Sequence, residues 1–468
     1  MSTVRRSEDM DATFLFAKNL ANIRYEDLPK GVVEATKKQV LDLLGVALGG
    51  FSKPGPKELG EIVGEWGGKE ESSIIGCTQK VPAPNAAHVN ATMAHALDYD
   101  DVHETAIMHS GVAVIPTCMA MGERKGNVSG KEFITAIALG VDMMCRLALA
   151  TTPGTRPLNT GWHLTTLYGF LGAAGTAGRM LGLDEERMVN ALGIAYHQCS
   201  GNGQCVIDGA LTKRMGPGFS VRGGITAALL AEKGVTGAKN CLEGEMGLYK
   251  LYHRGNYDNK ALTINLGKTF EGINVAIKPY PCCRGVHPAI DAALALVGER
   301  NIKAEGVEKI TLSVSEGHYH LLCEPEGAKL KPRNPVDAQF SIPWGVATAI
   351  VRKQVTLEDF TETAIKRQDI LDLTKKMSIK IDSTLNRPVN IEPTRVEITT
   401  TQGNVYSKEV AHPLGSLERP MSFDDCATKF RDCAKQLSKE HTDRVIEFIG
   451  QLEQMADIKK LINLLSLE

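Results

Sequence analysis

Residues 172–178 read GAAGTAG, a run without one bulky side chain inside a segment that otherwise has helical spacing. Glycine costs about 1 kcal/mol relative to alanine in a helix interior, so its repeated use indicates that neighbouring backbones approach closely. The stretches 31–47 and 132–150 also place apolar residues three and four positions apart, and we expect Lys37 on a solvated helix face. From about residue 12 to residue 266 the sequence therefore predicts a tight, mostly buried helix bundle.

The hydrophobic period changes after Asn265. Three segments alternate as half-buried strands do: 309–315, 377–381 and 395–401. Helical spacing occurs between them, at 287–297 and 343–352, and returns at the end of the chain, at 422–465.

These patterns predict a mainly α fold with two domains, the default number for a chain of 468 residues. We expect a large all-helical domain built from both chain ends and a smaller inserted α+β domain. The boundaries are 1–269 for the helical domain, with 410–468 packing back on it, and 270–409 for the α+β domain.

The charge balance gives no overall field that would gather nucleic acid or an anionic membrane, because 53 basic and 55 acidic residues leave a net charge of -2. No apolar run reaches the roughly 18 residues that span a bilayer, and no secretory signal is visible. The 11 cysteines have no regular spacing and are odd in number, which is typical of reduced thiols. We therefore expect a cytoplasmic enzyme without nucleic-acid or membrane partners.

Acidic groups and histidines are concentrated in residues 98–104, DYDDVHE, followed by His109. If the preceding helix continued, His95, Asp98 and Asp101 would share one face. The alternative is a capped helix end with a solvated loop. The apolar segment 111–116 would pull His109 into the protein, which favours a pocket for proton transfer.

Cations lie in two other segments. Lys213 and Arg214 precede Gly216 and Gly218, and a helix predicted to start at Ser220 would place its N-terminus beside them. This arrangement is typical of an anion-binding site. The alternative is a solvated cation pair at a helix end. The spacing is not that of a phosphate loop.

The second cationic segment is 278–284, KPYPCCR, and His287 follows it. Its two prolines predict a rigid hairpin that points Lys278 and Arg284 at a ligand, with Cys283 lining the pocket. A metal or redox site is disfavoured because the C-x-x-C spacing is missing. A metal site in the acidic cluster is disfavoured too, since Asp100, Asp101, His103 and His109 match no standard spacing.

Taken together, these segments resemble the MmgE/PrpD family, which contains 2-methylcitrate dehydratases, cis-aconitate decarboxylases and an iminodisuccinate epimerase. The matching pieces occur in family order over nearly the whole chain: 98–101 (DYDD) with His109-Ser110, 161–163 (GWH), 212–214 (TKR) with Pro217-Gly218, 278–284 (KPYPCCR) and 337–343 (DAQFSIP).

The resemblance implies a lid-like α+β domain, a homodimer and no required cofactor. Family active-site positions map onto Asp98, His109, His163, Lys213 and Lys278. Three positions depart from the family pattern: Val102 stands where decarboxylase-like members carry Thr, Gly216 where many members carry His, and Cys283 where the animal decarboxylase has His. The lid tyrosine expected of decarboxylases has no counterpart that we can place.

The chemistry that these residues favour is removal of a proton beside a carboxylate. Lys213 and Lys278 would hold a di- or tricarboxylate, with Arg214, Arg284 and Cys283 as further binding residues. The predicted reaction is dehydration of a 2-methylcitrate-like acid, without metal or cofactor. Epimerisation of a polycarboxylate such as iminodisuccinate comes second and decarboxylation of a cis-aconitate-type acid third.

The sequence leaves the acid/base roles open. His109 or Asp98 would take the proton, and His163 would protonate a leaving hydroxyl or the opposite face of the substrate. A non-catalytic polycarboxylate-binding protein is the alternative from another functional class. Such a protein needs cations but no acid/base groups, so the presence of these three side chains favours an enzyme.

Overall fold

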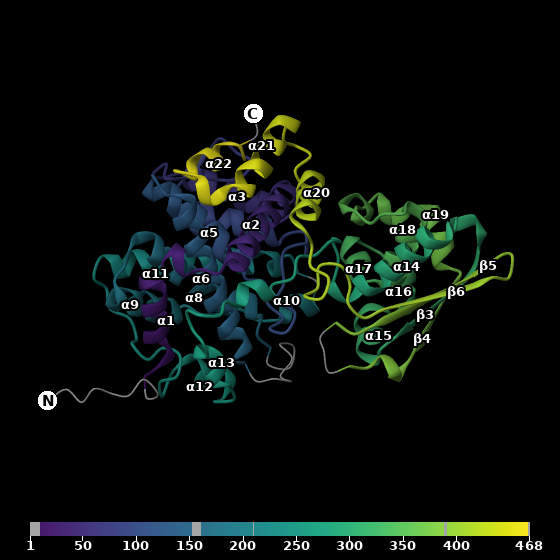
Figure 1. The fold of residues 1–468 in the computed structure, drawn as a ribbon, viewed down its shortest axis with the longest axis horizontal. Helices are drawn as coiled ribbons and strands as arrows, with labels where there is room; N and C mark the ends of the chain where they lie inside the picture. Colours follow the sequence, from purple (N-terminus) through teal and green to yellow (C-terminus); the bar gives the residue numbers. More distant parts are fainter. Residues whose placement is uncertain (1–9, 152–160, 209, 388–390, 467–468) are drawn as a thin grey trace. The chain divides into compact units, whose positions relative to one another are not determined.

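The computed structural model describes residues 10–151, 161–208, 210–387 and 391–466. The fold is mainly α, as predicted, with few and short strands (Figure 1). The chain divides into two compact units. Unit 1 comprises Met1–Ala96, Asp100–Val275 and Phe423–Glu468, and unit 2 comprises Leu97–Tyr99 and Ala276–Ser422. The domain boundaries expected from the sequence stay a prediction.

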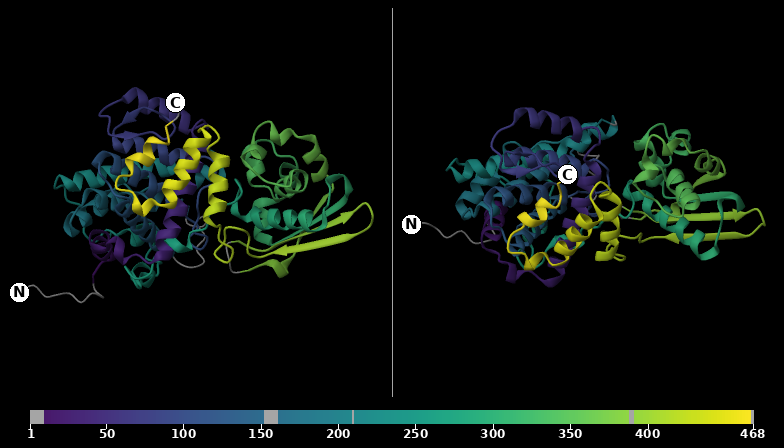
Figure 2. Two further views of the ribbon diagram at one scale, coloured as in Figure 1. Left: turned by 45° about the horizontal axis from the view of Figure 1, so that its top comes forward. Right: turned by 90° about the horizontal axis from the view of Figure 1, so that it is seen from above.

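In the described residues, unit 1 consists of helices and one short antiparallel strand pair, β1 (Ser72–Ser73) with β2 (Lys80–Val81). The α-helices described there are α1 (Ala12–Asn22), α2 (Lys30–Gly50), α3 (Pro56–Trp66), α4 (Ala83–His95), α5 (Gly111–Lys125), α6 (Gly130–Leu149), α8 (Leu164–Leu181), α9 (Glu185–Tyr196), α10 (Gln204–Ile207), α11 (Thr212–Glu232), α12 (Leu248–His253), α13 (Asn259–Thr263), α20 (Phe423–Cys433), α21 (Lys439–Gly450) and α22 (Lys459–Asn463). The C-terminal helices, yellow in Figure 2, pack on the helices of unit 1, with α20 and α21 against α2.

The glycines bring helices of unit 1 close together. A Cβ atom added to Gly140 of α6 would lie 2.2 Å from the Thr176 hydroxyl of α8, and one added to Gly224 of α11 would lie 2.6 Å from the Phe170 carbonyl oxygen of α8. Contacts this short leave no room for a side chain. The close approach predicted from residues 172–178 is therefore confirmed.

Three local expectations in unit 1 are wrong. Helix α4 ends at His95, and Asp98 has a φ of 53°, which breaks the helical path, so His95, Asp98 and Asp101 do not share a helix face. Helix α11 begins at Thr212 and takes Pro217 into its interior, so Lys213 lies in its first turn. Lys37 is buried and forms ion pairs with Glu34 and Glu453, because the C-terminal segment covers that face of α2.

Unit 2 contains a four-stranded sheet in the order β4-β3-β5-β6. The strands are β3 (Val307–Val314), β4 (Met377–Ile381), β5 (Thr394–Thr400) and β6 (Val405–Val410). Strand β3 pairs parallel with β4, opposing Ile310 to Met377, and antiparallel with β5, opposing Ile310 to Ile398. Strand β6 was not predicted. It forms an edge of the sheet, and only one of its six residues is buried, so its hydrophobic signal is weak.

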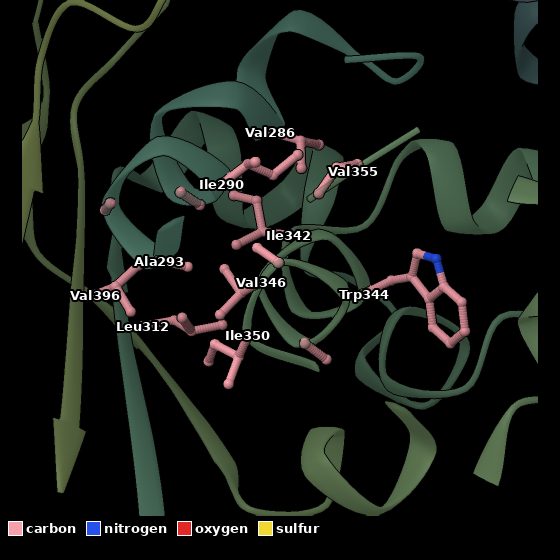
Figure 3. Close-up of a cluster of buried hydrophobic side chains, with 14 of the residues drawn as sticks. Val286, Ile290, Ala293, Leu312, Ile342, Trp344, Val346, Ile350, Val355 and Val396 are labelled. Carbon is pink, nitrogen blue, oxygen red and sulfur yellow. The ribbon is translucent and has the colours of Figure 1, made fainter. Parts of the chain in front are cut away.

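Helices cover the sheet of unit 2: α14 (His287–Arg300), α15 (Glu316–Leu322), α16 (Glu326–Leu330), α17 (Pro335–Gln339), α18 (Ile342–Arg352) and α19 (Gln368–Thr374). Ile342, Val346 and Ile350 recur every four residues along α18 and enter the buried cluster shown in Figure 3. Leu312 of β3 and Val396 of β5 complete it from the sheet side. The core of unit 2 is therefore a helix layer packed on one sheet face.

All eleven cysteines lie in the described part of the chain, and all are free thiols. Within the described residues, no helix is long and apolar enough to cross a membrane.

Candidate active site

A buried carboxylate in unit 1 joins two histidines. Asp100 Oδ2 lies 2.8 Å from His95 Nδ1 and 2.9 Å from His109 Nδ1. His95 is the last residue of α4, and His109 lies two residues before α5. The side chains of His95 and Asp100 are fully buried, whereas 14% of the His109 side chain is exposed. We call His95, Asp100, His109 and the nearby His163 the histidine cluster.

The hydrogen bonds of His109 determine its tautomer. Its Nδ1 faces both the Asp100 carboxylate and the backbone oxygen of Asp101. Both atoms are acceptors, so Nδ1 carries the proton, and Nε2 of the neutral ring keeps its lone pair. The His109 backbone is held as well, since its N–H donates to the Thr165 hydroxyl at 3.2 Å. His109 is therefore arranged as a base whose charge, once protonated, Asp100 would balance.

The pKa values of the two adjacent aspartates are shifted in opposite directions. Burial acts to raise the pKa of Asp100, but His109 and His95 together lower it well below its usual range. The pKa of Asp101 is raised well above its usual range by burial and then by the charges of Asp100 and Asp42. The surroundings therefore favour the ionised form of Asp100 and the protonated form of Asp101. The Asp101 carboxyl accepts from the Gly111 N–H at 3.1 Å, at the start of α5.

His163 lies beside this pair. It is the N-cap residue of α8, and Thr165 and Thr166 lie in the first turn of that helix. Its Nδ1 is 2.8 Å from the Thr166 hydroxyl, and its ring centroid is 5.9 Å from that of His95.

His95 and His163 are neutral at physiological pH. The pKa of His95 is lowered to about 4 by burial, against the opposing effect of Asp100. Desolvation, with the charge of Lys213, lowers the pKa of the half-buried His163 well below its usual range. The charge of Lys213 acts on both rings, which places this half-buried cation of α11 near the cluster.

Gly216 of α11 makes room for the Thr166 hydroxyl, which contacts His163. A Cβ atom added to Gly216 would lie 2.2 Å from the Thr166 hydroxyl and 3.6 Å from His163 Nδ1. The histidine that many family members carry at this position therefore does not fit the helix packing of this chain.

A second group of predicted site residues lies in unit 2. Lys278 Nζ donates to the backbone oxygen of Asp98 at 2.7 Å and is 3.6 Å from the Asp98 carboxylate. The Tyr99 hydroxyl donates to the Pro279 carbonyl oxygen at 2.8 Å. These contacts bind the segment Leu97–Tyr99 to the loop that carries Lys278. That loop is irregular rather than the expected hairpin.

The remaining cationic candidates have structural contacts. Arg284 is buried, and its Nη1 lies 2.9 Å from His287 Nδ1 and 2.8 Å from the Leu414 carbonyl oxygen. Arg214 donates to the Pro54 carbonyl oxygen at 3.3 Å. Cys283 donates its backbone N–H to the Gln339 carbonyl oxygen at 2.9 Å. Substrate binding by these three residues stays a prediction.

The structure brings together His109, His163 and Lys213, which the sequence singled out, and adds His95 and Asp100. Ligand atoms of His95, Asp100 and His109 lie within 4.8 Å of one another, a spacing that a metal ion could use. Hydrogen bonds from two Nδ1 atoms to one carboxylate oxygen already explain this proximity, so we assign no metal ligands. Sequence reasoning did not select His95 as a site residue. The one feature that could have indicated it is its place as a histidine at the end of an apolar helix.

The comparisons with known proteins cover nearly the whole chain. Residues 15–260 match the MmgE/PrpD N-terminal domain, and residues 280–454 match the MmgE/PrpD C-terminal domain. A cis-aconitate decarboxylase-like protein of Aspergillus oryzae is 27% identical over 96% of this chain and 95% of its own length. The cis-aconitate decarboxylase of Aspergillus terreus is 28% identical over 95% and 94% of the two chains. The human cis-aconitate decarboxylase is 27% identical over 96% and 93%.

Proposed function

Because the chain belongs to the MmgE/PrpD family, we propose that it is an enzyme, a lyase acting on a small polycarboxylate. We further propose that its reaction begins with removal of a proton from the carbon beside a carboxylate. The observation that carries this proposal is the hydrogen bonding of His109, whose Nδ1 is held by Asp100 and whose Nε2 is left with a lone pair.

In the proposed mechanism, His109 Nε2 takes the proton and Asp100 balances the imidazolium that forms. The electron pair of the broken C–H bond moves toward the neighbouring carboxylate, and Lys213 is proposed to stabilise that charge. The electrons then form a C=C bond as the hydroxyl on the next carbon leaves as water, taking the proton that His109 removed. The roles of Asp98 and Lys278 follow from the family resemblance and stay predictions.

The chemistry of the cluster favours dehydration over decarboxylation. In dehydration the proton that His109 removes can leave with the hydroxyl, whereas decarboxylation replaces CO2 by a proton on carbon and needs a separate acid. His95 and His163 have lowered pKa values and are poor acids at neutral pH. The contacts of His109 Nδ1 leave Nε2 as the atom suited to proton removal. We therefore propose a hydro-lyase that acts on a 2-methylcitrate-like hydroxy acid and needs no metal or cofactor.

Decarboxylation of a cis-aconitate-type acid is the second candidate. It is favoured by the names of the relatives, which match this chain over nearly its full length. Epimerisation shares the first step of the proposed mechanism but returns the proton to the opposite face of the same carbon.

The test is a substrate panel with purified protein: citrate, 2-methylcitrate, cis-aconitate and iminodisuccinate, with products identified by NMR. We expect an unsaturated acid from 2-methylcitrate or citrate. Release of CO2 from cis-aconitate without any dehydration would replace the hydro-lyase by the second candidate, and interconversion of stereoisomers alone would indicate an epimerase. No conversion of any compound would contradict the proposal of a polycarboxylate lyase.

We also propose that the protein acts as a cytoplasmic homodimer, as the family resemblance implies. Exposed apolar side chains on α3 and α11 support an interface there, with Trp66 52% and Phe219 45% exposed. A monomer at assay concentration in light scattering would contradict the dimer.

A further inference from the structure

His95 is the most enclosed member of the histidine cluster. Its side chain is fully buried, and its ring lies 5.0 Å from that of His109 in an edge-on arrangement. Its Nδ1 meets Asp100 Oδ2, and its Nε2 has no hydrogen-bond partner among the described residues. The bond to Asp100 is therefore the one side-chain hydrogen bond of this ring that the described structure contains.

Two imidazoles converge on a single carboxylate oxygen. His95 Nδ1 lies 2.8 Å and His109 Nδ1 2.9 Å from Asp100 Oδ2, and the His109 N–H is shared with the Asp101 carbonyl oxygen. Asp100 Oδ1 is buried without a hydrogen-bond partner in the described part of the chain. A carboxylate oxygen that accepts two donors is oriented by both and shares its negative charge between them. The orientation of Asp100, and its strength as an acceptor for His109, therefore depend on the second donor, His95.

We propose that His95 is a positioning residue for His109. It holds Asp100 in the orientation that fixes the His109 tautomer, and by sharing the carboxylate it moderates the attraction between Asp100 and protonated His109. This inference rests on the proposed function, in which His109 is the base, and it goes beyond the residues that the family resemblance implies.

His95 suits this role because it can donate a hydrogen bond without bringing a charge. Burial lowers its pKa to about 4, so the ring is neutral over the range in which His109 would work. A positive charge at this position would compete with protonated His109 for Asp100. The other titratable groups that act on the cluster are Lys213 of α11, His163 beside α8, and Asp101, which Asp42 of α2 and Lys429 of α20 influence in turn.

The first test uses the wild-type protein, labelled with 15N in its histidine rings and free of substrate. NMR reports which ring nitrogen carries the proton. We expect both His95 and His109 to be protonated on Nδ1 when neutral, and His95 to stay neutral down to about pH 5, since its pKa is about 4. A His95 ring protonated on Nε2 alone cannot donate to Asp100 and would overturn the proposal.

The second test compares His95→Leu with His95→Asn by following the titration of His109 in the unliganded protein. Leucine removes the donor, which makes Asp100 a stronger acceptor for His109. The midpoint of the His109 titration should rise by about one pH unit, as expected when a carboxylate pairs more strongly with a histidine. Asparagine can place its amide nitrogen where Nδ1 lies, so this variant should titrate like the wild type.

The matched control is His88→Leu. His88 lies on α4 as well, is buried, and has its pKa lowered to about 4 by burial, but its ring nitrogens have no hydrogen-bond partner among the described residues. An unchanged His109 midpoint in folded His95→Leu, or an equal shift in His88→Leu, would overturn the proposal. If His95→Leu does not fold, the tautomers of His95 and His109 in the wild-type protein decide whether the proposal holds.

Activity separates this proposal from the proposed function. The acid limb of the pH profile of kcat/KM should move up with the His109 midpoint in His95→Leu. A shifted His109 titration in a protein that converts no polycarboxylate would leave the role of His95 intact and contradict the proposed function alone.

Discussion

At the residue scale, the arrangement of His109 makes its substitution informative. In His109→Asn the amide nitrogen can still donate to Asp100, but no base remains. Because general base catalysis typically contributes about 100-fold or more, we expect kcat to fall by at least roughly that factor while KM changes much less. Steady-state kinetics on the substrate found in the panel measures both.

His441→Asn serves as the control for this substitution. His441 lies in the first turn of α21, outside the histidine cluster, and should keep wild-type activity. Full activity in His109→Asn would move the role of base to Asp98, the alternative that the sequence left open.

The two lysines are tested by alanine. Each charged hydrogen bond to a substrate carboxylate contributes about 1.5 to 3 kcal/mol, so Lys213→Ala and Lys278→Ala should each reduce kcat/KM by at least roughly tenfold. The Lys213→Ala variant should lose kcat/KM and still fold, because the Lys213 side chain is only half-buried. Lys278 is buried, so circular dichroism must show that its variant is folded. Wild-type kinetics in both variants would contradict the predicted anion site.

The sequence could indicate which residues form the site, but not which of their side chains contact one another. His109, His163 and Lys213 were candidates because they lie beside apolar or glycine-rich segments. The partner of His109 is Asp100, and the loop geometry decides this, since the positive φ of Asp98 turns the chain after α4. No spacing rule predicts such a turn for a non-glycine residue.

At the element scale, the approach of α11 to α8 positions His163. In Gly216→Ala the new methyl group would meet the Thr166 hydroxyl, which holds His163 Nδ1. We expect a loss of about 1 to 3 kcal/mol in stability, as for other insertions into packed cores, and a fall in activity. Chemical denaturation and kinetics measure the two effects.

Gly60→Ala is the matched control for this element. Gly60 lies inside α3, and an added Cβ would meet nothing within 4 Å. The substitution should be neutral or stabilise by up to about 1 kcal/mol, because alanine favours the helix. Equal effects of the two substitutions would show that the contact between α8 and α11 is not tight.

The elements themselves were predicted where their periodicity is strong. The strands predicted near 309–315, 377–381 and 395–401 exist as β3, β4 and β5. The edge strand β6 was not predicted. The start of α11 was misplaced because proline usually marks a helix boundary, yet Pro217 lies within this helix. Packing of α11 on α4 and α8 outweighs the local preference.

At the scale of the whole molecule, three buried histidines and the half-buried His163 couple stability to pH. The pKa values of His88, His95 and His253 are lowered to about 4, chiefly by burial, and that of His163 is lowered well below its usual range. Below the unfolded-state pKa of about 6.5, the unfolded chain binds protons that the folded chain does not bind. Stability therefore falls as the pH drops from 7 toward 4.

Each of the three histidines with a pKa of about 4 should remove roughly 2 kcal/mol of stability between pH 7 and pH 5. Asp101 and Asp142, whose pKa values are raised mainly by burial, increase stability as the pH falls. These two carboxyls are fewer than the histidines with lowered pKa values. We expect a lower free energy of unfolding at pH 5 than at pH 7, measured by chemical denaturation. His88→Leu should reduce this difference by roughly 2 kcal/mol, and equal stability at both pH values would contradict the account.

The measurement that tests the central claim most directly is hydrogen exchange at carbon, followed by NMR in D2O. Wild-type protein is given 2-methylcitrate or citrate, and the dehydrated product is given separately to run the reaction in reverse. If His109 removes a proton beside a carboxylate, solvent deuterium should enter that carbon in the wild type, and the His109→Asn variant should lose this exchange together with turnover. Hydration of the unsaturated acid that places no deuterium at that carbon, or exchange that persists in His109→Asn, would contradict the account.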